Sequence, residues 1–181
     1  IVTDLCAIRK ITPAGVVTTV AGVFDISGSN DGPGAEARFA GPNGVCADPS
    51  GNVYIADEWN NTIRKLSPEL IVTTIAGIPR STGSTDGTGA EARFGSPSGL
   101  TVDSTGNIFA ADYLNKIIRK ITSAGEVTTI AGTAGVDGSL DGIGPDARFS
   151  TPVDVALDGS GNIFVVENCT VRRIAPTRNV T

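Results

Sequence analysis

The residues that most resemble a chemical site lie in three Gly-rich segments of the chain. Each segment begins with an acid, has a second acid five residues later and ends in Arg and Phe, as in the run DGPGAEARF at 31–39. Carboxylates spaced along a Gly-bent loop are typical calcium ligands. Each loop supplies only two carboxylates, and a nearby Arg competes for them, so we favour an ion pair that pins the loop. No cofactor is predicted, with calcium as the alternative.

The predicted ties join the Arg of each loop to an acid of the same loop. The first acid is the expected partner, and the second acid, Glu36 in the first loop, is the alternative. The residues are Asp31 with Arg38, Asp86 with Arg93, and Asp141 with Arg148.

A second set of acids closes three short apolar runs at Asp57, Asp112 and Glu167. Such acids either cap a turn by accepting backbone N–H bonds or act in catalysis. Catalysis needs acids whose environments differ, whereas equivalent positions of a repeat have similar environments. We therefore expect caps, and we predict no catalytic and no metal-binding residue.

Composition excludes several classes of function. The sequence contains no His, which rules out a Ser-His-Asp triad, a Cys-His pair and an imidazole zinc site among these residues. The net charge is −5, whereas nucleic-acid binding usually requires a basic surface. No apolar run reaches the roughly 18 residues that a membrane span needs. We predict no nucleic-acid partner and no membrane insertion.

The elements that position these residues recur every 55 residues. Arg38, Arg93 and Arg148 keep this step, and so do Asn52 and its counterparts Asn107 and Asn162. A fixed period of this size indicates an array of supersecondary units. The chain holds little more than three such units, lacks Met and starts inside an apolar run. We expect it to be a window of a longer or processed chain.

Each unit predicts four short strands. In the second unit they cover 99–103, 107–112, 117–122 and 127–131, and Gly, Asn and Ser turns separate them. Five-residue runs rich in Val, Ile and Thr between such turns are typical of an antiparallel meander. No helical period appears, so the predicted class is all-β, and tandem four-stranded meanders predict β-propeller blades.

The run PSGLTVDSTGNIFAADYLNKIIRKITSAGEVTTIAG, at 97–132, resembles the NHL repeat. The resemblance implies propeller blades in an incomplete ring, divided as 1–22, 23–77, 78–132 and 133–181, with the last unit lacking its outer strand. The family includes enzymes, RNA-binding modules and extracellular interaction domains. Its gluconolactonase-like members use acids and Asn around an axial metal, and we expect no axial acid here that differs between blades.

Other candidate sites lie in the blade loops. Three N-x-[ST] sequons make Asn60, Asn168 and Asn179 candidates for glycosylation. A disulfide between Cys6 and Cys46 would join adjacent blades, and buried free thiols are the alternative. Trp59 and Tyr113 are candidate partner contacts, with half-buried packing as the alternative.

These features together predict an extracellular or cell-surface module that is structural or binds partners and is not an enzyme. Its partners would be proteins, glycans or copies of itself, and it could form a segment of a larger assembly or filament. One alternative is a metal-dependent lactonase or hydrolase propeller. Another is an RNA-binding module, which the acidic charge disfavours.

Overall fold

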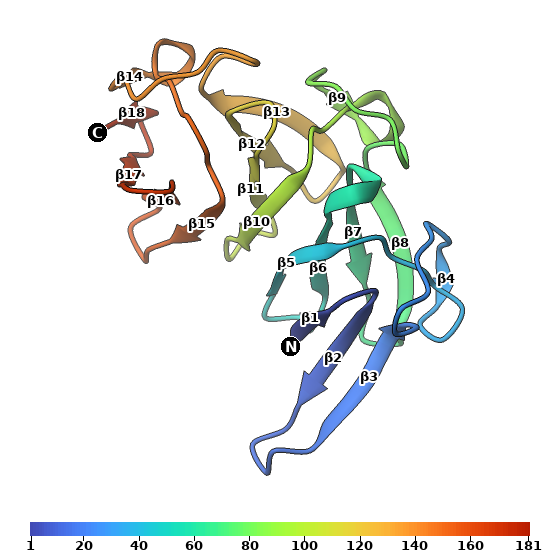
Figure 1. Cartoon of the computed structure of the whole chain (residues 1–181). Coiled ribbons are helices and arrows are strands. Elements are labelled where there is room, and N and C mark those ends of the chain that lie inside the picture. The colour runs from blue at the N-terminus through green and yellow to red at the C-terminus, as the bar shows by residue number, and fades with distance from the viewer.

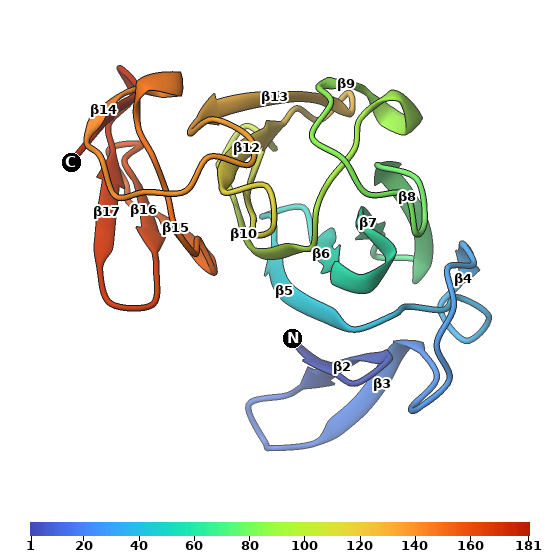
Figure 2. The same ribbon diagram turned by 45° about the horizontal axis from the view of Figure 1, so that its top comes forward.

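The computed structural model describes residues 1–181 as four antiparallel sheets that follow one another along an arc (Figures 1 and 2). We call the sheets the first to fourth blades in chain order. The first blade holds three strands, β1 (Val2–Asp4), β2 (Ala7–Ile11) and β3 (Val17–Gly22). Each strand pairs with the next, so the sheet is a simple meander.

The second and third blades each form a complete four-stranded meander. In the second blade the strands are β5 (Pro42–Ala47), β6 (Val53–Asp57), β7 (Thr62–Leu66) and β8 (Ile71–Ala76). In the third they are β10 (Pro97–Val102), β11 (Ile108–Asp112), β12 (Ile117–Ile121) and β13 (Glu126–Ala131). The predicted all-β fold of four-stranded blades is confirmed, with each predicted strand displaced by at most two residues.

Side-chain hydrogen bonds close the turn between the first two strands of the second, third and fourth blades. In the third blade Asp103 accepts from the backbone N–H and the side-chain amide of Asn107, at 2.9 and 2.8 Å. Asp48 with Asn52, and Asp158 with Asn162, repeat both bonds. The turn Gly between each pair has a positive φ, which glycine adopts without strain.

A fifth, two-residue strand was absent from the sequence prediction. The long loop entering each blade first runs along the outer edge of that blade and pairs with its last strand (Figure 1). The three pairs are β4 (Gly32–Pro33) with β8, β9 (Gly87–Thr88) with β13, and β14 (Gly142–Ile143) with β18 (Asn179–Val180). Each of these outer strands is two residues long and includes a Gly, so it is too short to show the alternating apolar pattern that predicts a strand.

The fourth blade contains β15 (Asp154–Leu157), β16 (Ile163–Val166), β17 (Val171–Ile174) and β18. The prediction that this unit lacks its outer strand is wrong in part, because β18 begins that strand and pairs with β17 through Ile174 and Val180. Three-residue 3-10 turns are the helices of the chain: η1 (Glu58–Asn60), η2 (Gly89–Glu91) and η3 (Gly144–Asp146). None of them is long and apolar enough to cross a membrane.

The hydrophobic core is divided into three clusters, one between each pair of neighbouring blades. Each cluster contains one fully buried Phe from the connecting loop, as predicted: Phe39, Phe94 and Phe149. No blade buries its own apolar face, so neighbouring blades stabilise one another through these contacts. The loops that carry the Phe residues also carry the acids of the candidate sites.

Candidate interaction surface and axial groove

A fully buried arginine lies at the centre of each complete blade. Arg64, on β7, is 0% exposed and donates to Asp57 from the adjacent strand and to Asp31 from the entering loop, both at 2.7 Å. It also donates to the backbone carbonyls of Asn30 and Arg38. Its guanidinium lies 5.1 Å from the centre of the Phe39 ring. The side chain of Arg64 therefore links its own strand, β7, to the adjacent strand β6 and to the long loop that enters the blade.

The same cluster recurs in the next two blades. Arg119 binds Asp112 and Asp86, both at 2.9 Å, and Arg172 binds Glu167 at 3.4 Å and Asp141 at 2.6 Å. Sequence analysis identified the acids but missed these arginines as their partners. The signal was present, because Arg64, Arg119 and Arg172 occupy one position of the repeat and follow their acids by five to seven residues.

The predicted ties within each Gly-rich loop are wrong. Arg38 does not pair with Asp31 but donates to the carbonyls of Ala35 and Ala37, which closes the loop on itself. Arg93 and Arg148 make the corresponding contacts. The first acids instead reach the strand arginines, so Asp31, Asp86 and Asp141 fasten each loop to its blade.

The acids that close the second strands accept backbone hydrogen bonds, although from an unexpected donor. Asp57 accepts from the N–H of Ala40, 17 residues earlier, at 2.7 Å, and Asp112 accepts likewise from Gly95. Burial raises the pKa of Asp112 to about 6, although Asn115 and Arg119 donate to its carboxylate. The carboxylate is ionised at neutral pH, and its oxygens are occupied by donors of the chain itself.

The loop acids fit a structural role better than a calcium site. Both oxygens of Asp31 are engaged, one by Arg64 and by the hydroxyl of Thr74, and the other by the N–H of Thr74. No group of three or more His, Cys, Asp or Glu side chains gathers closely enough to hold a metal ion. Calcium prefers six to eight oxygen ligands, whereas both carboxylate oxygens of Asp31 already accept bonds from the chain itself.

The glycosylation candidate Asn60 is contradicted by the fold. Its side chain is 0% exposed and donates to Asp57 at 2.8 Å and to the carbonyl of Gly28 at 2.7 Å. An amide that is buried and donates two hydrogen bonds within the chain cannot carry a sugar in the folded protein. Asn168 and Asn179 are exposed, and they stay candidates.

The predicted disulfide is also contradicted, because Cys6, Cys46 and Cys169 are all free thiols. Side chains on β5 alternate between the two faces of the second blade. Val45 packs against the core shared with the first blade, and Cys46 packs against the core shared with the third. Cys46 therefore points away from the blade that carries Cys6.

One exposed apolar side chain stands in the corresponding loop of each of the first three blades, between β1 and β2, between β6 and β7, and between β11 and β12. In the first three blades these are Leu5, 57% exposed, Trp59, 68%, and Leu114, 57%. We call the surface that carries these three residues the Trp59 face. Neighbouring loops on it are joined, since the N–H of Ser96 binds the side chain of Asn61 at 2.8 Å. Tyr113, the other predicted contact, is half-buried beside Leu114.

A groove of about 460 Å³ opens next to Trp59, where the first blade meets the second. We call it the Trp59 groove. Its charged residues are Asp25 and Glu58, and its lining includes the exposed Leu5 and the backbone of Gly41. Gly41 has φ +58°, and a Cβ there would lie 2.6 Å from Cδ2 of Trp59. One face of the indole therefore covers Gly41.

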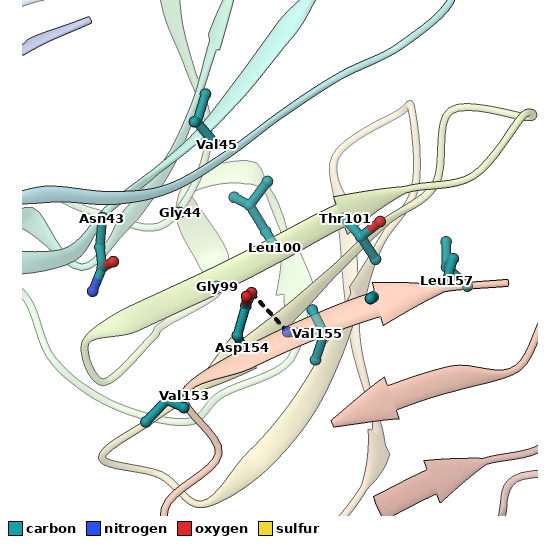
Figure 3. Close-up of a pocket in the computed structure, with 11 residues that line it drawn as sticks. Asn43, Gly44, Val45, Gly99, Leu100, Thr101, Val153, Asp154, Val155 and Leu157 are labelled. Carbon is teal, nitrogen blue, oxygen red and sulfur yellow. Dashed lines mark hydrogen bonds between the residues drawn. The ribbon is translucent and has the colours of Figure 1, made fainter. Parts of the chain in front are cut away.

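The first strands of three blades line a second hollow, the axial groove, of about 430 Å³ (Figure 3). Here one position differs between blades: Gly44 and Gly99 correspond to Asp154. A Cβ at position 99 would lie 2.5 Å from the Cα of Asp154, so this glycine permits the close approach of β15. The expectation that no axial acid differs between blades is wrong. The repeat itself contained the signal, because the P-x-G of the second and third blades becomes P-x-D in the fourth.

The axial groove has a sparse set of ligands. Asp154 is its one carboxylate, and Oδ1 of Asp154 accepts from the N–H of Val155 at 2.8 Å (Figure 3). The amide of Asn43 is turned to Glu58, with Nδ2 donating to Oε2 at 2.8 Å. The side-chain oxygens of this lining are those of Asp154, the amide oxygen of Asn43 and the hydroxyl of Thr101, fewer than the six or so oxygen ligands that calcium or magnesium takes.

Comparison with known proteins identifies the repeat. Residues 39–66 match the NHL repeat family. The chain is 39% identical over 95 residues to Protein SUPPRESSOR OF QUENCHING 1, chloroplastic, of Arabidopsis thaliana, covering 52% of this chain and 9% of that protein. It is 39% identical over 124 residues to NHL repeat-containing protein 2 of Gallus gallus, covering 66% and 17%. The chain thus spans less than a fifth of these relatives.

Solved structures share the fold and have mixed functions. A structural genomics protein of unknown function from Bacteroides thetaiotaomicron aligns with TM-score 0.71 and 25% identity, covering 93% of this chain and 39% of that chain. An auxiliary nutrient binding protein from Bacteroides ovatus gives 0.70 and 23%, covering 92% and 42%. Virginiamycin B lyase from Staphylococcus aureus gives 0.62 and 18%, covering 97% and 47%. The chain is therefore a run of β-propeller blades, in which residues 39–66 match the NHL repeat.

Proposed function

We propose that the chain is a non-enzymatic interaction module that presents the Trp59 face to a protein partner. The observation that carries this proposal is the row formed by Leu5, Trp59 and Leu114, in which corresponding loops of three blades each expose one large apolar side chain. An exposed tryptophan on a rigid surface is a frequent anchor of protein interfaces, and the two leucines beside it extend the apolar area that a partner could cover.

The loops beneath this face are held rigidly, which favours binding. Asp57 and Asn60, on either side of Trp59, are 0% exposed and bonded to each other. The N–H of Trp59 itself donates to the carbonyl of Ala40 at 3.0 Å. A surface fixed in advance loses little conformational entropy when a partner binds.

The geometry supports an enzyme less well. The acids at equivalent positions, Asp57, Asp112 and Glu167, all bind arginines and serve the fold. Asp154 is the acid that breaks the repeat at the axis, and its groove offers no second carboxylate to work with it. The differing residue makes the axial groove a second candidate site for a small polar ligand. The acidic charge of −5 again disfavours RNA.

We place this module outside the cell or at its surface, and we include other copies of the chain among its partners. The exposed sequons at Asn168 and Asn179 support this placement. The intact mass of the natural protein, before and after enzymatic glycan removal, tests it. A mass that falls after treatment is the expected result, and an unchanged mass contradicts it.

Selection from a displayed library of random peptides tests the proposed function. The chain is immobilised, and each selected peptide is measured against the wild type, Trp59→Ala and a control variant, Asp154→Asn. We expect peptides that bind the wild type and Asp154→Asn equally and bind Trp59→Ala at least tenfold more weakly. Peptides whose binding depends on Asp154 would favour the axial groove as the binding site. Failure to select any peptide whose binding depends on Trp59 would overturn the proposal.

A further inference from the structure

The Trp59 groove combines an open aromatic face with negative charge. Trp59 is 68% exposed even though one face of its indole covers Gly41, so the other face is open. Asp25 and Glu58 are the charged side chains that line the same groove. Tryptophan is the aromatic residue that best attracts a cation, and nearby carboxylates strengthen that attraction.

Both acids are positioned by the surrounding chain. Asn43 donates to Oε2 of Glu58, which orients the carboxylate and leaves Oε1 without a partner in the chain. Asp25 has a left-handed backbone, with φ +59°, in the tight turn that the pairing of Val23 with Ile26 closes. The groove therefore presents negative charge at fixed points beside the indole.

The other charged residues near the Trp59 groove leave its net charge negative. Asp4, adjacent to Leu5 in sequence, is half-exposed and lies 3.9 Å from Arg9, so that pair is neutral. Two cations lie in adjoining loops: the backbone N–H of Arg80 binds the carbonyl of Asn60, and the guanidinium of Arg38 is held by the carbonyls of Ala35 and Ala37. The lining of the groove itself contains no Lys or Arg.

We propose that the Trp59 groove binds an arginine side chain from an extended segment of a partner protein. The guanidinium lies on the open face of Trp59 and pairs with Glu58 and Asp25, and an apolar neighbour of that arginine packs on Leu5. A planar guanidinium stacks on an indole and pairs with carboxylates at the same time, which an ammonium does less well. This inference rests on the proposed function and adds the chemistry of the partner.

The next blade provides an internal comparison. At the positions equivalent to Glu58 and Trp59 it carries Tyr113 and Leu114. These residues retain the apolar contact but supply neither the carboxylate nor the indole. The same backbone loop therefore forms an arginine site in the second blade and an apolar contact in the third.

The chain contains a single tryptophan, so its fluorescence reports on this groove alone. The probe is a blocked pentapeptide with a central arginine flanked by leucines, compared with the same peptide containing citrulline, which is the same size but uncharged. We expect a saturable fluorescence change with the arginine peptide and roughly tenfold weaker binding of the citrulline peptide, about 1.4 kcal/mol. Affinity for the arginine peptide should fall as salt is added.

Variants separate this inference from the proposed function. Glu58→Gln keeps the hydrogen bond to Asn43 but removes the charge, and it should lower the affinity for the arginine peptide several-fold. Tyr113→Phe should leave that affinity unchanged. Thermal unfolding confirms that both variants fold. Equal binding of the arginine and citrulline peptides would overturn the inference. Trp59-dependent library peptides without arginine would overturn it as well, while leaving the proposed function standing.

Discussion

Residues 57–61 contain two regions of opposite character within one short loop. Asp57 and Asn60 point inward, are 0% exposed and are bonded to each other, and Asp57 also accepts from Arg64. Glu58 and Trp59 point outward beside a groove. The inner pair has counterparts of the same type in the third blade, Asp112 and Asn115, whereas the outer pair is replaced by Tyr and Leu.

The difference between the two regions separates structure from recognition. The inner residues are repeated because every blade must fasten its entering loop to its strands, and the same buried ion pair does so each time. The outer residues are free to vary because no core depends on them. We therefore expect inner substitutions to change stability and outer substitutions to change binding.

Removing a buried arginine should have the largest effect. Arg119→Met leaves Asp112 buried without its cation, and we expect a loss of about 3–5 kcal/mol in the free energy of unfolding. Denaturation by urea measures it. Arg172→Met should cost less, because the side chain of Arg172 is 7% exposed, compared with 0% for Arg119, and lies 3.4 Å from Glu167, compared with 2.9 Å for the pair in the third blade. Equal losses would contradict the comparison.

The buried acid should give the chain a distinctive pH dependence. The pKa of Asp112 is raised from 3.8 to about 6 in the folded chain, so the folded state holds this proton more tightly than the unfolded state does. The stability that Asp112 contributes is therefore present below pH 4 and is lost as the pH rises through 6. Relative to Asp112→Asn, the wild type should lose about 2–3 kcal/mol between pH 4 and 6.

Asp158, in an exposed turn, is the matched control for that experiment. Hydrogen bonds from the side chain and backbone of Asn162 lower the pKa of Asp158. Its contribution to stability is present above pH 4 and is lost as the pH falls, so Asp158→Asn should reveal a dependence of opposite sign. A rise in the contribution of Asp112 between pH 4 and 6 would contradict the burial of that carboxyl group.

Removing the inner amide should have an intermediate effect. Asn115→Ala takes one donor from Asp112 and one from the carbonyl of Gly83, and we expect a loss of about 1–2 kcal/mol by urea denaturation. The fourth blade has a loop two residues shorter, in which the exposed side-chain amide of Asn168 makes neither of these bonds. Asn168→Ala in that loop should change stability by less than about 0.5 kcal/mol. Similar losses for both variants would mean that the two hydrogen bonds of the Asn115 amide are not important for the fold.

Removing the outer tryptophan should have a smaller effect on stability than removing Arg119 or the amide of Asn115. Trp59 is 68% exposed, so Trp59→Ala should change the free energy of unfolding by less than about 1 kcal/mol. The same variant should lose most of its peptide affinity. A loss of stability comparable to that of Arg119→Met would place Trp59 with the inner residues and contradict its assignment to recognition.

The sequence predicted the blades well because their signals are local. Alternating apolar residues, Gly-Asn turns and the 55-residue step define the four strands of each meander without reference to distant contacts. The fifth strands, such as β9, were missed because pairing of the loop with the outer edge depends on tertiary structure. The burial of Phe94 was predicted correctly from its place in the connecting loop.

The candidate sites were harder to predict because partners in space are distant in sequence. Asp31 and Arg64 are 33 residues apart, and a nearer residue, Arg38, appeared to be the obvious partner. The sequon at Asn60 gave no sign that this amide is buried. The substitution of Gly by Asp154 was visible in the repeat, but only the structure shows that the position lines the axial groove.

Mapping the bound arginine peptide by nuclear magnetic resonance tests the central claim most directly. Amide and indole N–H signals of the chain are followed as the peptide is added. We predict the largest shifts at the indole of Trp59, at Glu58 and in the turn from Val23 to Ile26, with the inner strand residues Gly99 and Asp154 unchanged. Shifts concentrated at Gly99 and Asp154 would contradict the claim and identify the axial groove as the binding site.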